Sequence, residues 1–313
     1  MSEEPVLLSE DRDETRILTL NRPSKLNAMN DALVHGLVDA VDAAHAEDQI
    51  ATIVLTGSER AFSAGADIKE AATRQDASPE EARHHADLSR AIYQLGNRTD
   101  KPVIAAVRGY VLGGGCNLAI TADMVVAGEG AVFGYPELKR GMGATLVAPG
   151  LVHRIGPKAA FELLMLAEDI SAEKALSLGL INRVVADDKV LDEALEMAKT
   201  LAGFDRRAMR ATKRVFINAT PSGAAVFASA FLLSFLAAFG GDGIALPLAL
   251  ATWGATKAAT PAPAAFAMPR RLKICAGASA LQPTASASNS FIITAFIVLW
   301  DPRRRRAATG LVP

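Results

Sequence analysis

The stretch GYVLGGGCNLAITAD, residues 109–123, joins a glycine-rich turn to an apolar helix and follows a buried strand expected at 101–107. If Gly114 begins that helix, its N–H has no partner within the helix and lies at the positive end of the helix dipole. A second glycine-rich turn, RAFSAGADIKE (60–70), follows the apolar run ATIVLTG at 51–57. One N–H group from each turn could therefore converge on a single oxygen and form an oxyanion hole.

Glycines in such turns have three other common roles: a dinucleotide-binding turn, a phosphate-binding P-loop and a turn that permits tight packing. The spacing G-x-G-x-x-G of a dinucleotide-binding turn is absent, and no acidic residue stands at a strand end about 20 residues further on. A phosphate-binding P-loop is excluded because no Gly-Lys-Ser/Thr follows the glycines. A turn whose glycines only permit tight packing stays open on the spacing alone.

Strand-like and helix-like segments alternate along the first 220 residues. The alternating residues 6–10 and 15–21 predict a β-hairpin, and short strands are expected at 124–128 and 131–134. Apolar residues recur at helical spacing in the segments 30–48, 79–96, 158–167, 172–178, 188–202 and 205–217. This alternation predicts an α/β fold with helices on the faces of a sheet.

Composition limits the functional classes. The 313 residues carry a formal net charge of −1, so the chain has no basic footprint for nucleic acid. Cys116 and Cys275 are the only cysteines, and they stand in no metal-ligand spacing. Residues 1–14 are acidic and lack the apolar segment of a secretory signal. We therefore expect a cytoplasmic protein with no metal site and no disulfide.

The composition changes abruptly after Thr220. Residues 221–313 contain 24 alanines and 8 basic residues but only two acidic ones, which predicts a domain at 1–220 and an atypical Ala/Pro-rich tail at 221–313. The stretch 255–289 is of low complexity and typical of disorder. The apolar run 224–239 is shorter than the ~18–20 residues of a membrane span, so a membrane partner is disfavoured. An aberrant tail from a shifted reading frame is preferred to a membrane-associating segment or an unusual packed domain.

Four blocks resemble the signature segments of the crotonase superfamily, the enoyl-CoA hydratases and isomerases. They stand in the family's order and spacing, within a match from about residue 5 to 219: NRPSKLNAMN (21–30), AFSAGADIKE (61–70), VRGYVLGGGCNLAITAD (107–123) and FGYPELKRGM (133–142). The resemblance implies a crotonase-like ββα spiral core and an acyl-CoA thioester substrate. It also implies no cofactor beyond the coenzyme A of that substrate, and assembly as a homotrimer or a dimer of trimers.

The same resemblance implies roles for individual residues. The N–H groups of Ala66 and Gly114 would bind the thioester oxygen. The backbone of the segment 64–68 would hold the adenine end of coenzyme A, and the loop 25–28 would form the other wall. The residues assigned to coenzyme A are Lys25, Leu26, Ala28, Ala64, Gly65, Asp67 and Ile68.

The proton-transfer residues depart from those of the family's hydratases, which resemble one another in two glutamates. Glu137 matches the second glutamate, but Asn117 stands in place of the first. An amide can orient a water but cannot accept or release a proton at neutral pH, and the loss of a general acid–base group costs ~10²–10⁴-fold in rate. One carboxylate suffices to shift a double bond, so the residues favour isomerisation while the wider resemblance favours hydration. Asn117 is alternatively an amide that only satisfies loop backbone.

The tail does not resemble the family's C-terminal helices, which cover the site and pack in the trimer. The alternative function is therefore a non-catalytic acyl-CoA-binding protein disabled by its altered tail.

Overall fold

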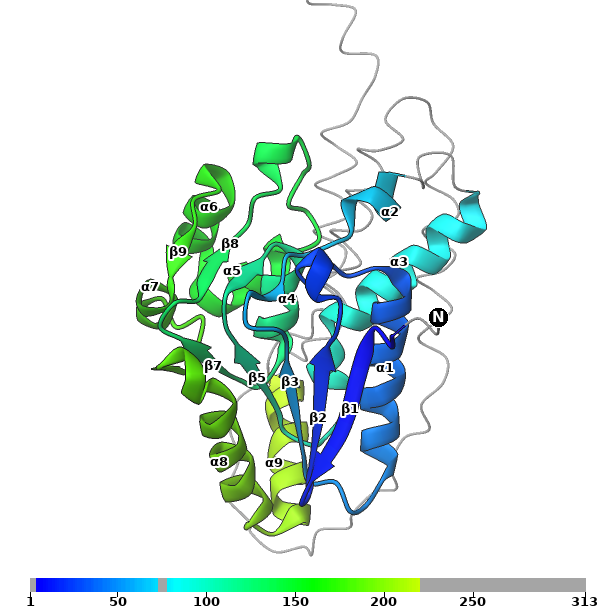
Figure 1. The fold of residues 1–313 in the computed structure, drawn as a ribbon, viewed down its shortest axis with the longest axis vertical. Coiled ribbons are helices and arrows are strands. Elements are labelled where there is room, and N and C mark those ends of the chain that lie inside the picture. The colour runs from blue at the N-terminus through cyan, green and yellow to red at the C-terminus, as the bar shows by residue number, and fades with distance from the viewer. Residues whose placement is uncertain (1–3, 73–77, 220–313) are drawn as a thin grey trace, which may run out of the picture. The chain divides into compact units, whose positions relative to one another are not determined.

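The computed structural model describes residues 4–72 and 78–219, and this part of the chain contains two β-sheets (Figure 1). The larger, six-stranded sheet has the order β1-β2-β3-β5-β7-β10, with β1 antiparallel to β2 and the other pairs parallel. Its strands are β1 (Leu7–Arg12), β2 (Thr15–Leu20), β3 (Thr52–Thr56), β5 (Val103–Val107), β7 (Met124–Gly128) and β10 (Arg183–Val185).

The smaller sheet has four short strands in the order β4-β6-β8-β9, in which β9 alone is antiparallel to its neighbour. These strands are β4 (Ala61–Ser63), β6 (Tyr110–Leu112), β8 (Val132–Gly134) and β9 (Ile170–Ser171). Strands β3 and β4 lead into one helix, and β5 and β6 lead into another. Each glycine-rich block of the sequence therefore lies at the end of a β-β-α unit.

Nine α-helices surround the sheets in the described ranges (Figure 1). They are α1 (Asp31–Ala46), α2 (Ile68–Ala72), α3 (Pro79–Tyr93), α4 (Gly114–Thr121), α5 (Ala148–Ile155), α6 (Pro157–Leu166), α7 (Ala172–Ser177), α8 (Val190–Ala202) and α9 (Arg206–Ala219). Short 3₁₀ turns lie at Pro23–Lys25, Leu95–Arg98, Leu138–Arg140 and Asp187–Lys189.

Side-chain caps explain where two of these helices begin. The Asn30 side chain accepts a hydrogen bond from the Leu33 N–H at the start of α1. At α3, Ser78 and Glu81 form a reciprocal capping box, and a proline occupies the first turn. Such caps satisfy N–H groups that have no partner within the helix and contribute about 1 kcal/mol each.

Alternate residues of the large sheet face two separate apolar cores. Ile53 and Leu55 of β3 belong to the larger core, which α1 and α4 help to form. Val54, between them, packs with Val190 and Met197 of α8 in the smaller core. Side chains alternate between the two faces of a strand, so an apolar run such as ATIVLTG is what a strand with both faces covered requires.

The predicted α/β fold with a ββα core is confirmed. The hairpin and the expected helices are present, with ends within about three residues of the prediction. The prediction was incomplete: β4, β6 and the start of α2 lie within the segments expected to be turns, and α5, β9 and β10 were not foreseen. The predictions for 221–313, the domain boundary at 220 and the apolar run 224–239 lie outside the described residues. Across 4–72 and 78–219, no helix has both the length and the apolar character that a bilayer crossing needs.

Lys101 fixes the end of α1 to the start of β5. Its side chain is fully buried, and its Nζ donates hydrogen bonds to the carbonyls of Ala44 and Glu47, each at 2.5 Å. Its own carbonyl accepts a hydrogen bond from the Lys213 Nζ of α9 at 2.6 Å. The amine thus satisfies the Ala44 carbonyl near the C-terminus of α1 and is a second donor to the Glu47 carbonyl, which also accepts from the Ile50 N–H.

We expect Lys101→Met to lower the free energy of unfolding by roughly 2–4 kcal/mol, because two buried carbonyls lose a charged donor. Lys158→Met, at an exposed position at the start of α6, is the matched control and should change stability little. Urea denaturation followed by circular dichroism measures both variants. Equal stability of the two would show that the buried amine contributes nothing net.

Candidate active site

Gly65 lies where the loop after β4 crosses the loop after β6. Its φ is +93°, a conformation that favours glycine. A Cβ atom placed there would lie 2.9 Å from the Leu112 carbonyl oxygen and 3.2 Å from the Gly114 nitrogen. Any larger residue would therefore push the two loops apart.

The crossing places two free N–H groups beside each other. A Cβ atom on Gly114 would lie 3.6 Å from the Ala66 nitrogen, so both residues border one space. Neither the Ala66 N–H nor the Gly114 N–H donates to another group in the described part of the chain. Gly114 also opens α4, where the helix dipole favours negative charge. An oxyanion hole needs two such donors close together, and the binding of a thioester oxygen by Ala66 and Gly114 stays a prediction.

The two segments predicted to hold coenzyme A are hydrogen-bonded to each other. Met29 donates its N–H to Gly65 and accepts from the N–H of Asp67, and the Ala64 N–H donates to Leu26, with all three distances at 2.8–2.9 Å. These bonds use the backbone on either side of Ala66 and leave its own N–H pointing elsewhere. Lys25 is exposed at the end of the Pro23–Lys25 turn.

The placement of the remaining predicted residues follows from these bonds. Ala28 and Ala64 are partly buried along the joined segments, and Ile68 is 41% exposed at the start of α2. The structure thus brings both predicted walls together.

Two residues that support these segments were not predicted. Asn27 is fully buried; its amide accepts from the Arg22 N–H at 2.8 Å and donates to the Ala61 carbonyl at 2.9 Å. The Arg22 guanidinium donates to the carbonyl of Ala28 and, at 3.0 Å, to the Asp67 carboxylate. The polar residues of NRPSKLN were the available signal, but a scaffold role needs partners that only the fold supplies.

Asp67 has a structural environment. Burial alone would raise its pKa, but hydrogen bonds from Arg22 and from the N–H groups of Glu70 and Lys69 hold the pKa below its ordinary value. An ionised carboxylate in this position begins α2 and ties it to the loop of Arg22. Its contact with coenzyme A stays a prediction.

Glu137 lies directly against the turn that precedes Gly114. A Cβ atom on Gly113 would be 2.7 Å from the Glu137 Oε1 atom, and the Gly113 φ of +52° also favours glycine. The Glu137 Oε2 atom is buried and makes no hydrogen bond within the described residues. Burial raises the pKa of Glu137 above its ordinary value, against the smaller opposing effects of its own backbone and Arg140. Such a carboxylate is suited to exchange protons near neutral pH.

Asn117 lies on the same helix as Gly114 and is only 2% exposed. Its Oδ1 atom has no hydrogen-bond partner among the described residues. A Cβ atom on Gly150 of α5 would lie 3.1 Å from that oxygen, so the amide packs against α5. Nothing in the described chain supports the alternative that this side chain satisfies loop backbone, since no such hydrogen bond is present.

Other reactive groups nearby do not form a second catalytic centre. Burial raises the pKa of the Cys116 thiol to about 12, so this side chain is neutral rather than a nucleophile. Residues 4–72 and 78–219 contain no group of three or more His, Cys, Asp or Glu side chains that could hold a metal.

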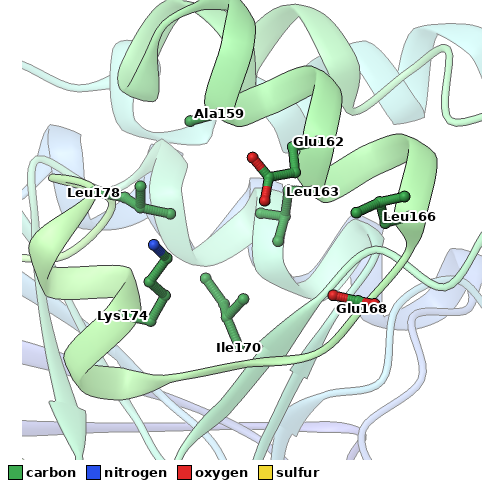
Figure 2. A pocket seen from close by; sticks show the side chains of 8 residues that line it. All are labelled: Ala159, Glu162, Leu163, Leu166, Glu168, Ile170, Lys174 and Leu178. Atoms are coloured by element: carbon green, nitrogen blue, oxygen red, sulfur yellow. The ribbon is translucent and has the colours of Figure 1, made fainter.

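A small cavity lies elsewhere, between α6, β9 and α7, and shares no residue with this site (Figure 2). Its volume is about 60 Å³, enough for a few waters but not for a thioester. It is lined by Ala159, Glu162, Leu163, Leu166, Glu168, Ile170, Lys174 and Leu178.

Comparison with known proteins identifies the family of this site. The model of the enoyl-CoA hydratase/isomerase family matches residues 13–228. The chain belongs to this family. It is 38% identical over 218 residues to a probable mitochondrial enoyl-CoA hydratase of Dictyostelium discoideum, covering 68% of this chain and 75% of that protein. It is 39% identical over 207 residues to the 2,3-dehydroadipyl-CoA hydratase of Escherichia coli K12, covering 63% and 76%.

Solved structures of the family have the same fold. A carnitinyl-CoA dehydratase from Mycobacterium avium 104 superimposes with a TM-score of 0.68 at 34% identity, covering 76% of this chain and 93% of that one. The enoyl-CoA hydratase of Mycobacterium tuberculosis H37Rv gives a TM-score of 0.61 at 30% identity, covering 72% and 95%. The crotonase-like fold and an enzyme of the hydratase/isomerase class are therefore confirmed, and the non-catalytic alternative receives no support.

We expect Gly65→Ala to lower turnover at least 100-fold, because its methyl group would meet the Leu112 carbonyl and the Gly114 N–H, and losing one oxyanion donor costs ~10²–10³-fold. Gly179→Ala is the control: Gly179 also has a positive φ, +74°, but no atom lies within 4 Å of the added Cβ. Both variants carry backbone strain of ~1–2 kcal/mol. The melting temperature of each variant reports the backbone strain, and its turnover reports the effect on the site. Equal turnover of the two variants would contradict the importance of the close contact at Gly65 for the site.

Proposed function

We propose that this enzyme shifts a double bond in an enoyl-CoA thioester, with Glu137 as the group that carries the proton. One observation supports this choice: Glu137 lies against Gly113, next to the Gly114 N–H, while the other position expected to carry a carboxylate holds the amide Asn117. The site thus offers two oxyanion donors and one proton-transfer group.

The proposed steps use one proton and no external reactant. Glu137 breaks the C–H bond at carbon 2 of a 3-enoyl thioester, and the electron pair moves into an enolate. The thioester oxygen, now negative, accepts hydrogen bonds from the Ala66 and Gly114 N–H groups. The protonated Glu137 then delivers the proton to carbon 4, and the thioester carbonyl re-forms with the double bond between carbons 2 and 3. Each donor of this kind is worth about 3–4 kcal/mol of barrier.

Hydration is the second candidate. Several relatives carry the name hydratase, and the Asn117 Oδ1 atom, which lacks a partner in the described chain, could accept a hydrogen bond from a water. In that reaction Glu137 would take a proton from the water and return it to carbon 2, while Asn117 would only orient the water.

We further propose that the joined segments 25–28 and 64–68 hold coenzyme A, that no other cofactor is needed, and that the enzyme is a cytoplasmic homotrimer or dimer of trimers. The hydrogen bonds between Met29, Gly65 and Asp67 support the first point because they fix both walls at once. Exposed apolar side chains support assembly: Phe161 on α6 and Val215 and Phe216 on α9 are 59–68% exposed.

Glu137→Gln should abolish the conversion of 3-enoyl-CoA to 2-enoyl-CoA, with a loss of at least ~10²-fold, because the amide cannot carry a proton. The proposed first step requires the ionised carboxylate, and burial raises the pKa of Glu137. Wild-type activity should therefore fall with decreasing pH at a higher pH than a solvated glutamate would give. A pH series of initial rates checks both points. A Glu137→Gln variant as active as wild type would contradict the proposal.

Asn117→Glu should raise the hydration of crotonyl-CoA at least 10-fold over wild type, because it supplies a second proton-transfer group beside the first. Asn117→Gln has a side chain of the same length as Glu but no charge, and is the control for packing against Gly150. Ultraviolet absorbance of the conjugated thioester follows the reaction. If wild type hydrates crotonyl-CoA well and Asn117→Glu adds nothing, hydration with an oriented water becomes the function.

A further inference from the structure

Tyr93 ends α3 and is held against α4. Its carbonyl accepts a hydrogen bond from the Thr121 hydroxyl at 3.1 Å. Shortly after it, Gly96 is so close to the end of α4 that an added Cβ would lie 2.1 Å from the Thr121 carbonyl oxygen. The backbone of Tyr93 is therefore fixed relative to the helix that begins with Gly114.

The Tyr93 hydroxyl reaches the start of that same helix. A Cβ atom on Gly114 would lie 2.8 Å from this hydroxyl, 3.0 Å from the Met29 Cε atom and 3.6 Å from the Ala66 nitrogen. The hydroxyl thus borders the same space as Gly114 and the Ala66 nitrogen. Glu137 contacts Gly113, the preceding residue, so the phenol and the carboxylate flank one turn of backbone.

The phenol is a neutral donor in this environment. Burial raises the pKa of Tyr93 above its ordinary value, and the negative charge of Glu137 raises it further. A phenol that stays protonated can donate to a carboxylate or to a water, but it cannot replace the base. The Oε2 atom of Glu137 is buried with no partner in the described chain and can accept such a bond.

The other groups around Glu137 are less suited to this role. The Arg140 side chain is exposed, the Cys116 thiol is a weak donor, and the Tyr135 hydroxyl is fully buried beside that thiol. The Tyr93 hydroxyl is the atom nearest to the Cβ position of Gly114.

We propose that Tyr93 is a positioning residue for Glu137: during turnover its hydroxyl donates a hydrogen bond, directly or through one water, to the Glu137 carboxylate. This inference rests on the proposed function of Glu137. The bond would orient the carboxylate toward the thioester and favour its ionised form, because a hydrogen bond to a carboxylate stabilises the charge. The bond would thereby help to hold the Glu137 carboxylate in place in a site where position 117 carries an amide instead of a second carboxylate.

The test compares Tyr93→Phe with Tyr110→Phe, whose residue is 44% exposed on β6, in the full-length chain. Turnover of 3-enoyl-CoA and crotonyl-CoA is measured across pH, together with exchange of the carbon 2 hydrogens of butyryl-CoA in D₂O, which reports enolate formation without a net reaction. We expect Tyr93→Phe to lower kcat and the exchange rate about 10-fold, the effect of one hydrogen bond to a charged group. The fall in activity at low pH should move to higher pH, with KM and melting temperature unchanged.

Three outcomes would overturn the inference. A Tyr93→Phe variant with wild-type kcat and an unmoved pH profile would leave Tyr93 as packing only. A raised KM with unchanged kcat would make it a substrate contact rather than a positioning residue. Exchange and turnover that survive Glu137→Gln, or are absent in wild type, would overturn the proposed function itself and the role of Tyr93 with it.

Discussion

The close contact between Gly65 and the backbone of residues 112–114 is the constraint on which the site depends. Strands β4 and β6 are paired in parallel, so the loops that follow them leave the same edge of the small sheet. The missing side chain lets those loops touch, and the bonds from Met29 occupy the backbone around Ala66. In the described part of the chain, the N–H groups of Ala66 and Gly114 have no acceptor, and the two residues border one space. In the proposed reaction these donors would already be in place when the substrate binds, which is what makes electrostatic stabilisation effective.

The two carboxylates near this crossing differ because their surroundings differ. Asp67 receives hydrogen bonds from Arg22 and from backbone N–H groups, and these hold its pKa low. Glu137 is partly buried, and burial raises its pKa more than its own backbone and Arg140 lower it. Environments that push two carboxyl pKa values apart assign them different tasks. Asp67 therefore holds loops together, while Glu137 is left able to exchange a proton.

The sequence predicted what depends on local pattern, and it missed what depends on tertiary contact. The helix of residues 31–46 and the buried strand at 52–56 carry clear periodicity, and the two glycine blocks indicated where the chain turns. Helix α5 was missed because Ala148–Ile155 is short, has no side-chain cap and contains both Pro149 and Gly150, which are poor helix formers. The contact that explains Gly150 appears only in the folded structure, where the missing side chain leaves room for the Asn117 amide.

The same limit applies to Tyr93, which no motif marks, and it explains why α4 joins the parts of the site. The first residue of α4 presents the Gly114 N–H, the next turn carries Asn117, and its last residue, Thr121, holds the backbone of Tyr93. A helix of eight residues is stiff over this length, so the contacts at its end hold the phenol in a fixed place relative to Gly114 and Asn117. The end of α3 therefore belongs to the site through its contacts with both ends of α4, although no residue of α3 belongs to a signature block.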